Sequence, residues 1–243
     1  MLEDNQINMY DYFTNVAISA TTVDRTMSIG ACLGVLGDCE QLQLDNDSYI
    51  RDFFVRHNIG IYLVSRYVEI VDMPQYKSNI RTHTSIYKLS SACGYRNTYI
   101  YDDRDNILVR SYAMGAFIYL DSGKIARVSQ NFLNGYELCP QLDMEYPPRK
   151  IQPTGILQEC GCVVVTYSFL DIYGHVNNVK YVALACDYVE NISRVRATRV
   201  EYRKSAMLGD TMYVRKYVDN SKVYIQLYNC SDVYAIIEFD LDI

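Results

Sequence analysis

The chain has 243 residues, 49% hydrophobic and 21% charged, which suffices for one large or two small domains with their own cores. Its net charge of −6 argues against a nucleic-acid-binding protein, since such proteins carry a basic excess. The first residues, MLEDNQINMYDYF, lack the basic and apolar regions of a signal peptide, and no apolar run approaches the ~18–20 residues of a membrane span. We therefore expect a cytoplasmic protein.

The first half of the chain predicts one helix followed by a meander of strands. Cys32, Val35, Leu36 and Cys39 recur at i, i+3, i+4 and i+7, the spacing of one helical face. An insertion, residues 45–60, separates this helix from the strands. Four strand-like runs then follow, at 61–71, 78–91, 94–103 and 106–121.

Prolines mark a boundary between the halves. Four of the five prolines lie between Pro140 and Pro153. Because proline lacks a backbone donor and restricts the residue before it, this stretch cannot be a helix interior or a central strand. We expect residues 140–153 to link an N-terminal domain, 1–139, to a C-terminal domain, 154–243.

The second half repeats the order of the first. An apolar face of Val179, Val182, Ala183, Cys186 and Val189 predicts a helix over 176–191. Strand-like runs follow at 195–204, 211–219, 222–229 and 232–242. RYVEI at 66–70 and TRVEY at 198–202 fall at the equivalent place in each half, a faint internal repeat. This pattern predicts an α+β fold in which a curved antiparallel sheet wraps a helix, twice.

Cysteine and histidine usage gives no sign of a metal site. Eight cysteines are scattered in a chain too long to need disulfides, so we expect reduced thiols. Cys160 and Cys162 have no second pair at zinc-ligand spacing, so we predict no metal and no cofactor. Cys186, a lone thiol on an apolar face, is interpreted as packing, and His57 and His83 as structural.

Two segments of the second half resemble motifs of a known family. DIYGHVNNVKY, residues 171–181, stands at the entry of the second helix, and EYRKSAMLGD, residues 201–210, follows. They resemble D-x-N-x-H-V-N-N-x-x-Y and E-Y-(K/R)-(K/R)-E-C followed by G-D of the acyl-acyl carrier protein thioesterases of plants and bacteria. The likeness runs from about Phe13 to the C-terminus. It implies two tandem hot-dog domains, each a long helix wrapped by a curved antiparallel sheet, with the site in the second.

The residues of the first motif suit thioester hydrolysis. Asp171 could deprotonate a water, and His175 could polarise the carbonyl or share the proton. The helix that follows brings its free N–H groups and positive dipole end to the same place, and Asn177 or Asn178 is a good N-cap. The alternative is that Asp171 and the asparagines are only turn and cap residues, and His175 a structural hydrogen bonder.

This chain departs from the family at three positions. The family's asparagine falls on Tyr173, which is larger and lacks the paired donor and acceptor of an amide. Its glutamate and cysteine fall on Ser205 and Ala206, so no carboxylate base and no nucleophile stand there. We keep Tyr173 and Ser205 as candidate catalytic residues, because a hydroxyl can still orient or hold a water.

The resemblance also implies a partner, an acyl carrier protein with its phosphopantetheine-linked acyl chain. Arg194, Arg196, Arg199, Arg203 and Lys204 lie close together in sequence and could dock this acidic carrier. The alternative is a solvated strand edge, where basic residues deter aggregation. The acyl chain needs an apolar tunnel, which the resemblance places in the first half, near the 32–39 helix and the 45–60 insertion.

Two functions stay open from the sequence. The first is hydrolysis of fatty acyl-acyl carrier protein to free fatty acid, with acyl-CoA as a further candidate substrate. The second is a weakly catalytic or non-catalytic acyl-thioester-binding protein, which the departures at 173, 205 and 206 would suit. Fusion of two hot-dog units already supplies the pairing that single units obtain by dimerising, so a monomer is feasible beside a homodimer.

Overall fold

The computed structural model describes residues 6–242, so residues 1–5 and Ile243, at the outer ends of the two predicted domains, lie outside the described residues. The elements of the first half are β1 (Met9–Asn15), η1 (Ile18–Ala20), α1 (Ile29–Asn46), α2 (Ser48–Arg56), β2 (Ile59–Ile70), β3 (Asn79–Leu89), β4 (Cys93–Tyr101), β5 (Ile107–Tyr119) and α3 (Gln130–Asn134). Those of the second half are β6 (Ile156–Val164), η2 (Tyr167–Phe169), α4 (Asn178–Cys186), η3 (Ile192–Arg194), β7 (Val195–Tyr202), β8 (Thr211–Asp219), β9 (Lys222–Tyr228) and β10 (Val233–Leu241). The elements labelled η are short 3-10 helices.

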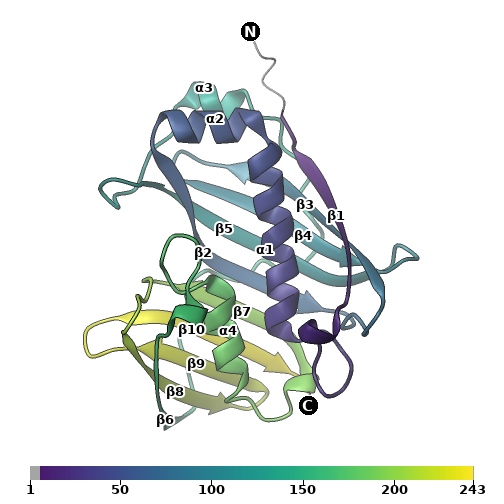
Figure 1. Ribbon diagram of the computed structural model, residues 1–243, viewed down its shortest axis with the longest axis vertical. Helices are drawn as coiled ribbons and strands as arrows, with labels where there is room; N and C mark the ends of the chain where they lie inside the picture. The colour runs from purple at the N-terminus through teal and green to yellow at the C-terminus, as the bar shows by residue number, and fades with distance from the viewer. Residues whose placement is uncertain (1–5, 243) are drawn as a thin grey trace.

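The strands of the described residues form one antiparallel sheet (Figure 1), in the order β1-β3-β4-β5-β2-β7-β10-β9-β8-β6. At its centre β2 pairs with β7, with Arg66 opposite Val200 and Val68 opposite Thr198. The two fragments of the predicted repeat therefore pair with each other around the pseudo-twofold axis of the molecule. The strands on both sides of the boundary predicted at 140–153 belong to one sheet.

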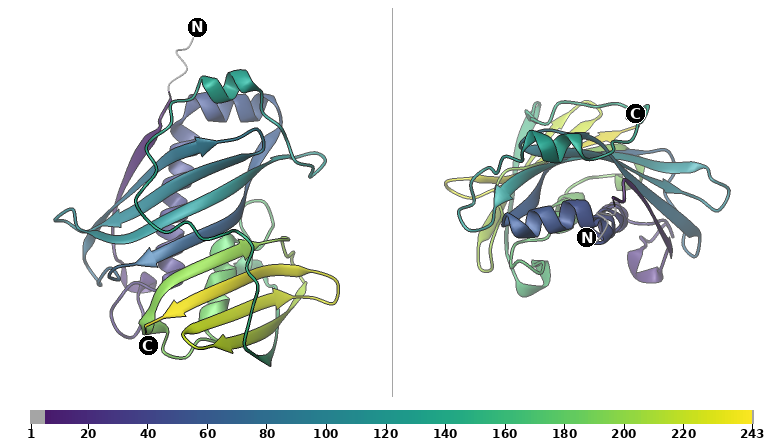
Figure 2. Two further views of the ribbon diagram at one scale, coloured as in Figure 1. Left: turned by 180° about the vertical axis from the view of Figure 1, so that it is seen from behind. Right: turned by 90° about the horizontal axis from the view of Figure 1, so that it is seen from above.

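The predicted order of a helix followed by a strand meander in each half is confirmed, but the first half contains two further helices, α2 and α3. The run predicted at 211–219 coincides with β8, whose Met212 and Val214 point inward while Tyr213 is exposed. This alternation follows from the two-residue period of a strand, which places every second side chain on one face. The sheet curves around α1 (Figure 2, right).

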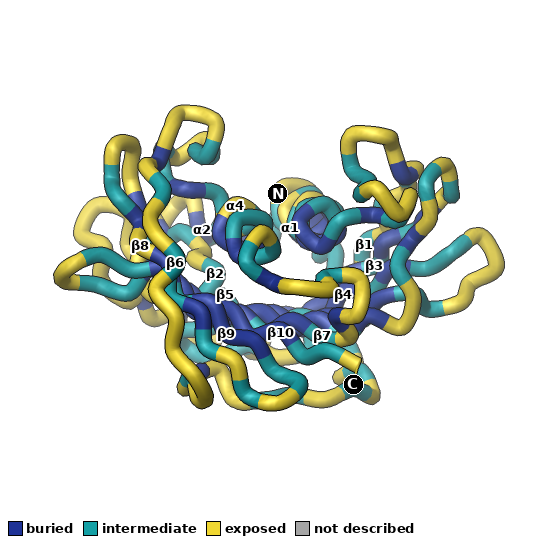
Figure 3. The backbone as a smooth tube through the Cα atoms, turned by 90° about the horizontal axis from the view of Figure 1, so that it is seen from below, coloured by how far each residue is buried: buried dark blue, intermediate teal, exposed yellow. Residues whose placement is uncertain are grey.

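Helix α1 confirms the helix predicted around 32–39. Ser28 caps it, with Oγ accepting from the Ala31 N–H at 3.1 Å. Its face of Cys32, Leu36 and Cys39 is buried against the sheet. Helices α1 and α4 lie side by side on the same face of the sheet (Figure 3). No helix within residues 6–242 combines the length and apolar character needed to cross a bilayer.

The second helix is shorter than predicted. Instead of 176–191, α4 covers only Asn178–Cys186. Beyond it the Val189 N–H bonds to the carbonyl three residues back, as in a tight turn, and Asn191 takes a left-handed φ of 56° that redirects the chain towards β7. Val189 still reaches the core, which explains why the apolar spacing continues past the end of the helix.

Buried side chains form two main clusters. The larger one lies between α1, α4 and the central strands and includes Leu36, Val182 and Ile237. The smaller one includes Phe54 and Phe132 and lies where α2 and α3 cover one end of the first half (Figure 1). Burial of such apolar surface is the main force holding the helices on the sheet.

Residues 140–153 carry no helix or strand and cross the face of the sheet that points away from the helices (Figure 2, left). Side chains of the sheet hold this segment, here called the strap. Asn97 Oδ1 accepts from the Leu142 N–H at 3.1 Å, and Glu201 Oε2 accepts from the Ile151 N–H at 2.9 Å. The strap is therefore fixed to strands of both halves rather than being a free linker.

Candidate active site

A tight turn before α4 contains the predicted acid and imidazole. Asp171 Oδ1 accepts hydrogen bonds from the N–H groups of Tyr173 at 2.9 Å and His175 at 3.1 Å. Gly174 has a φ of 77°, the left-handed region that suits glycine. Asp171 is thus a turn residue, as the alternative interpretation expects, yet its Oδ2 atom has no protein hydrogen-bond partner within residues 6–242.

The imidazole and the start of α4 lie beside this turn. The ring of His175 stands near the ring of Tyr62 on β2, with centroids 6.2 Å apart. Asn177 is the N-cap of α4, since its Oδ1 accepts from the Val179 N–H at 3.0 Å, and Asn178 is the first helical residue. The positive end of the helix dipole therefore lies next to the acid and the imidazole.

A cavity of about 830 Å³ connects this turn with the interior of the first half. Its polar lining in the second half includes Asp171, Tyr173, His175, Asn177, Asn178 and Ser205. Its apolar lining in the first half includes Leu33, Leu44, Ile50, Phe54, Ile59 and Phe117. Both α1 and the 45–60 insertion line it, and the insertion forms α2. A polar turn thus adjoins apolar space within one cavity, the arrangement that an acyl thioester would need.

The positions that depart from the family motif lie around the same turn. Tyr173 is 70% exposed, and its hydroxyl has no hydrogen-bond partner among the described residues. Ser205 lines the cavity, and its hydroxyl is likewise unpaired there. Ala206 is fully buried and acts through its backbone, where the carbonyl accepts from the Val176 N–H at 2.9 Å and the N–H donates to the Tyr181 hydroxyl at 2.8 Å.

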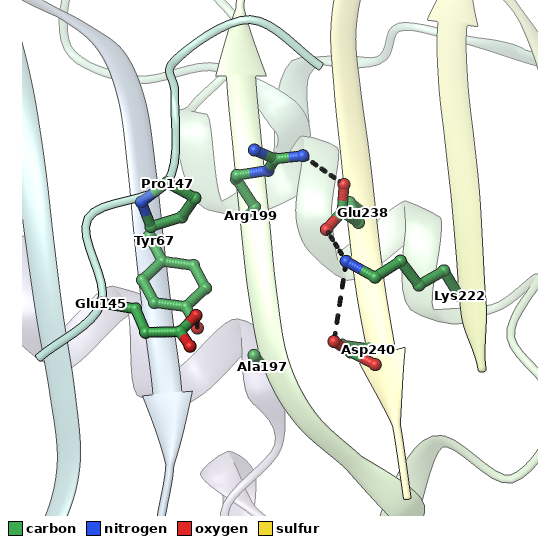
Figure 4. Close-up of a pocket in the computed structure, with 8 residues that line it drawn as sticks. All are labelled: Tyr67, Glu145, Pro147, Ala197, Arg199, Lys222, Glu238 and Asp240. Carbon is green, nitrogen blue, oxygen red and sulfur yellow. Dashed lines mark hydrogen bonds and ion pairs between the residues drawn. The ribbon is translucent and has the colours of Figure 1, made fainter. Parts of the chain in front are cut away.

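The five basic residues expected to form one docking patch do not lie together. Arg199 lies on the face of the sheet under the strap, where it forms an ion pair with Glu238 (Figure 4). Arg194 and Arg196 stand at the opposite end of β7 from the cavity. Nearness in sequence fails here because alternate residues of a strand point to opposite faces and eight residues span roughly 25 Å.

Only Arg203 and Lys204 of this group line the cavity. Arg203 pairs with Glu201 at 3.0 Å, and Lys204 pairs with Asp232 at 2.5 Å. Glu201 and Asp232 therefore offset much of the positive charge of Arg203 and Lys204.

The sequence analysis did not single out a buried polar cluster in the cavity wall, formed by Glu40 of α1, Arg66 of β2 and Arg96 of β4. Arg66 donates from Nη1 and Nη2 to the two oxygens of Glu40 at 2.9 and 2.5 Å, and Thr98 Oγ1 donates to Glu40 at 2.7 Å. Burial alone would raise the pKa of Glu40, but the two arginine charges and these hydrogen bonds lower it below its ordinary value. The sequence does give one sign of this cluster. Arg66 lies two residues before Val68 in a strand, so the two side chains share the inner face of β2.

The first half contains an equivalent loop, residues 21–28, before α1. There the Thr22 N–H donates to the Thr26 carbonyl at 2.8 Å, just as the Asp171 N–H donates to the His175 carbonyl at 2.8 Å. Thr22 and Thr26 of the first half therefore occupy the positions that Asp171 and His175 occupy in the second half. Of the two equivalent loops, only the one in the second half holds an acid and an imidazole.

Each half, a helix lying across a curved antiparallel sheet, is a hot-dog unit, and the joined units with their polar turn and apolar cavity are those of a double hot-dog thioester hydrolase. Family models agree with this class. The acyl-ACP thioesterase N-terminal domain matches residues 8–136, and the acyl-ACP thioesterase C-terminal domain matches residues 160–231. The chain belongs to the acyl-ACP thioesterase family, whose members hydrolyse thioesters.

Solved structures share the whole fold. An acyl-ACP thioesterase from Bacteroides thetaiotaomicron superposes with a TM-score of 0.87 at 18% identity, covering 97% of this chain and 98% of that chain. The 12:0-ACP thioesterase from Umbellularia californica gives a TM-score of 0.79 at 13% identity, covering 96% and 94%. At such identities the likeness establishes the fold alone. Among curated protein sequences, none matches this chain.

Proposed function

We propose that this chain hydrolyses the thioester of a fatty acyl chain on acyl carrier protein, at the Asp171–His175 turn, and releases the free fatty acid. The observation that carries this proposal is the cavity that joins the turn to apolar space in the first half. Membership of the acyl-ACP thioesterase family supports the same substrate class. Acyl-CoA, which presents the same phosphopantetheine thioester, is a further candidate substrate.

Asp171 is the candidate general base. The turn holds its Oδ1, whereas Oδ2 is left to accept a proton from a water molecule. The water oxygen bonds to the carbonyl carbon of the thioester, and the resulting oxyanion is stabilised by the positive end of α4 at Asn177 and Asn178. The carbon–sulfur bond then breaks, and the proton taken by Asp171 reaches the leaving thiolate through His175.

Arg203 and Lys204 are the best candidates for contact with the carrier. They line the cavity beside Ser205, whereas the other three members of the predicted patch lie elsewhere. Their paired carboxylates weaken the local field, so we assign them a role in orienting the carrier rather than in tight binding.

Replacing Asp171 by asparagine tests the mechanism. The amide keeps an oxygen for the two N–H groups of the turn but loses the charge and the basicity. We therefore expect Asp171→Asn to lower the release of free thiol from acyl carrier protein substrates by ~10²-fold or more, with an unchanged melting temperature. Unaltered turnover in a folded variant would reduce Asp171 to a turn residue.

A protein that binds acyl thioesters without cleaving them is the second candidate. Two observations favour it, namely the unpaired hydroxyl of exposed Tyr173 and the absence of a carboxylate at Ser205. Purified wild-type protein that binds acyl carrier protein substrates, yet releases no thiol over hours, would establish this alternative.

A further inference from the structure

The polar cluster carries more positive charge than negative charge. Arg66 and Glu40 form a bidentate ion pair with both side chains buried. Arg96 lines the same cavity, but its hydrogen bonding within residues 6–242 is limited to one bond, from Nη1 to the Glu40 carbonyl at 3.0 Å. One carboxylate therefore faces two guanidinium groups. Arg96 is left without a carboxylate partner in that part of the chain.

The strand register directs Arg96 into the cavity. Arg96 on β4 stands opposite Ala113 on β5, and Ala113 stands opposite Arg66 on β2. The two arginines thus share the inner face of the sheet, two strand spacings or about 10 Å apart. Burial lowers the pKa of Arg96, but a guanidinium remains protonated at neutral pH. The cavity wall holds a permanent cation with free donors.

An unsubstituted hydrocarbon chain is a poor occupant for such a wall. It would remove water from Arg96 and offer no acceptor, which is unfavourable for a charged group. An oxygen atom on the chain would instead accept from Nε or Nη2. We propose that the cavity selects acyl chains carrying a hydroxyl or keto oxygen, and that Arg96 binds this oxygen. The inference rests on the proposed function, because it takes the occupant to be an acyl thioester.

The oxygen belongs to the middle of the chain rather than to the carbons next to the thioester. The reaction point is marked by His175 beside Tyr62. Tyr62 stands opposite Ala116 and Arg66 opposite Ala113, three residues or roughly 10 Å apart along β5, and Arg96 lies two strands beyond Arg66. A hydroxyl at the third carbon would therefore not reach the guanidinium of Arg96.

Amide analogues of acyl-pantetheine separate binding from hydrolysis, because nitrogen replaces the thioester sulfur. Calorimetry on the full-length protein would compare the dodecanoyl amide with its 3-hydroxy and 8-hydroxy derivatives. We expect the 8-hydroxy amide to bind ~10–100-fold more tightly than the plain amide, the range for a hydrogen bond to a charged group. The 3-hydroxy amide should bind like the plain one.

Substitution of Arg96 tests the assignment to this residue. Arg96→Met keeps a long side chain but removes the charge and the donors, so the preference for the 8-hydroxy amide should disappear and the plain amide should bind more tightly. Arg110→Met is the matched control, since Arg110 lies on the outer face of β5 beside Glu69 and should leave the preference intact. Arg96→Lys keeps the charge and should retain part of the preference for the 8-hydroxy amide.

The wild-type measurement is decisive even if Arg96→Met does not fold. Equal binding of the three amides, or a preference for the 3-hydroxy amide, overturns the inference. A preference for the 8-hydroxy amide that persists in folded Arg96→Met also overturns the inference. Thiol release is measured separately: selective binding without release contradicts the proposed hydrolysis alone, whereas release without selective binding contradicts the role of Arg96 alone.

Discussion

Asp171 has a geometry that suits both roles that the sequence presents as alternatives. One oxygen satisfies the N–H groups of Tyr173 and His175 and so shapes the turn. The other oxygen is left without a protein partner in the described part of the chain, on a residue that lines the cavity. A carboxylate can serve both purposes because its two oxygens accept hydrogen bonds independently.

Tyr173 provides a prediction about a residue that differs from the family motif. Its hydroxyl makes no hydrogen bond within residues 6–242, and the residue is 70% exposed. We therefore expect Tyr173→Phe to change kcat/KM on acyl carrier protein substrates by less than about twofold, well below the ~10–100-fold that loss of a hydrogen bond to a charged group produces. Steady-state thiol release measures this.

The reverse substitutions provide the contrast. Tyr173→Asn combined with Ser205→Glu restores an amide and a carboxylate beside the cavity, and we expect it to raise turnover. A tenfold loss in Tyr173→Phe would show instead that the hydroxyl moves into the site when substrate binds. In that event the double replacement should lower activity.

The acid, the imidazole and the helix cap lie together at the start of α4, as the sequence predicts, because they belong to one continuous segment. It does not reveal the polar cluster, because Glu40, Arg66 and Arg96 come from a helix and two strands that only the folded sheet brings together. For the same reason the sequence does not reveal that the predicted docking patch is dispersed, because residues that are close in sequence point to opposite faces of one strand.

At the level of elements, apolar spacing predicts α1 and most strands but overestimates α4. A residue such as Val189 can return to the core from a turn, so its spacing alone does not separate helix from turn. Helix α1 differs because its period is sustained from Ile29 to Asn46 with a serine cap before it. Helix α1 lines the cavity from Leu33 to Asp45, whereas α4 lines it only from Asn178 to Tyr181.

The contact between α1 and α4 gives a prediction about packing. A methyl group on Gly30 would lie 3.2 Å from Ala183 Cβ of α4, whereas one on Gly34 would meet nothing within 4 Å. Gly34→Ala should therefore gain the ~0.5–1 kcal/mol of helix propensity that alanine has over glycine. Gly30→Ala should gain less or lose stability, because the added contact is too close. Urea unfolding of both variants gives the comparison.

Equal stabilisation by the two alanines would show that the helices move apart without cost. The pair is a matched control because both glycines belong to one helix and receive the same group. Residual activity provides a second readout, since Gly34 lines the cavity and Gly30 does not.

At the level of the whole molecule, the halves are held together by more than the strap. Strands β2 and β7 pair along the centre of the sheet, and α1 contacts α4. We expect cleavage at an engineered protease site between exposed Pro140 and Gln141 to leave the two fragments associated. Gel filtration should show one peak in buffer and two species in denaturant. Separation in buffer would mean that the strap is needed to keep the sheet intact.

The threonines of the 21–28 loop have a consequence for how such a protein diversifies. In a symmetric pair of hot-dog units every substitution acts twice, on the reaction centre and on the opposite binding wall together. Under the proposed function, the unit that would accommodate the chain has threonines at the acid and imidazole positions, and the unit that holds the acid and the imidazole contributes little of the apolar lining. We therefore expect selectivity and cleavage to be separately mutable, so that libraries confined to α1, α2 and β4 change the accepted chain while Asp171 and His175 stay constant.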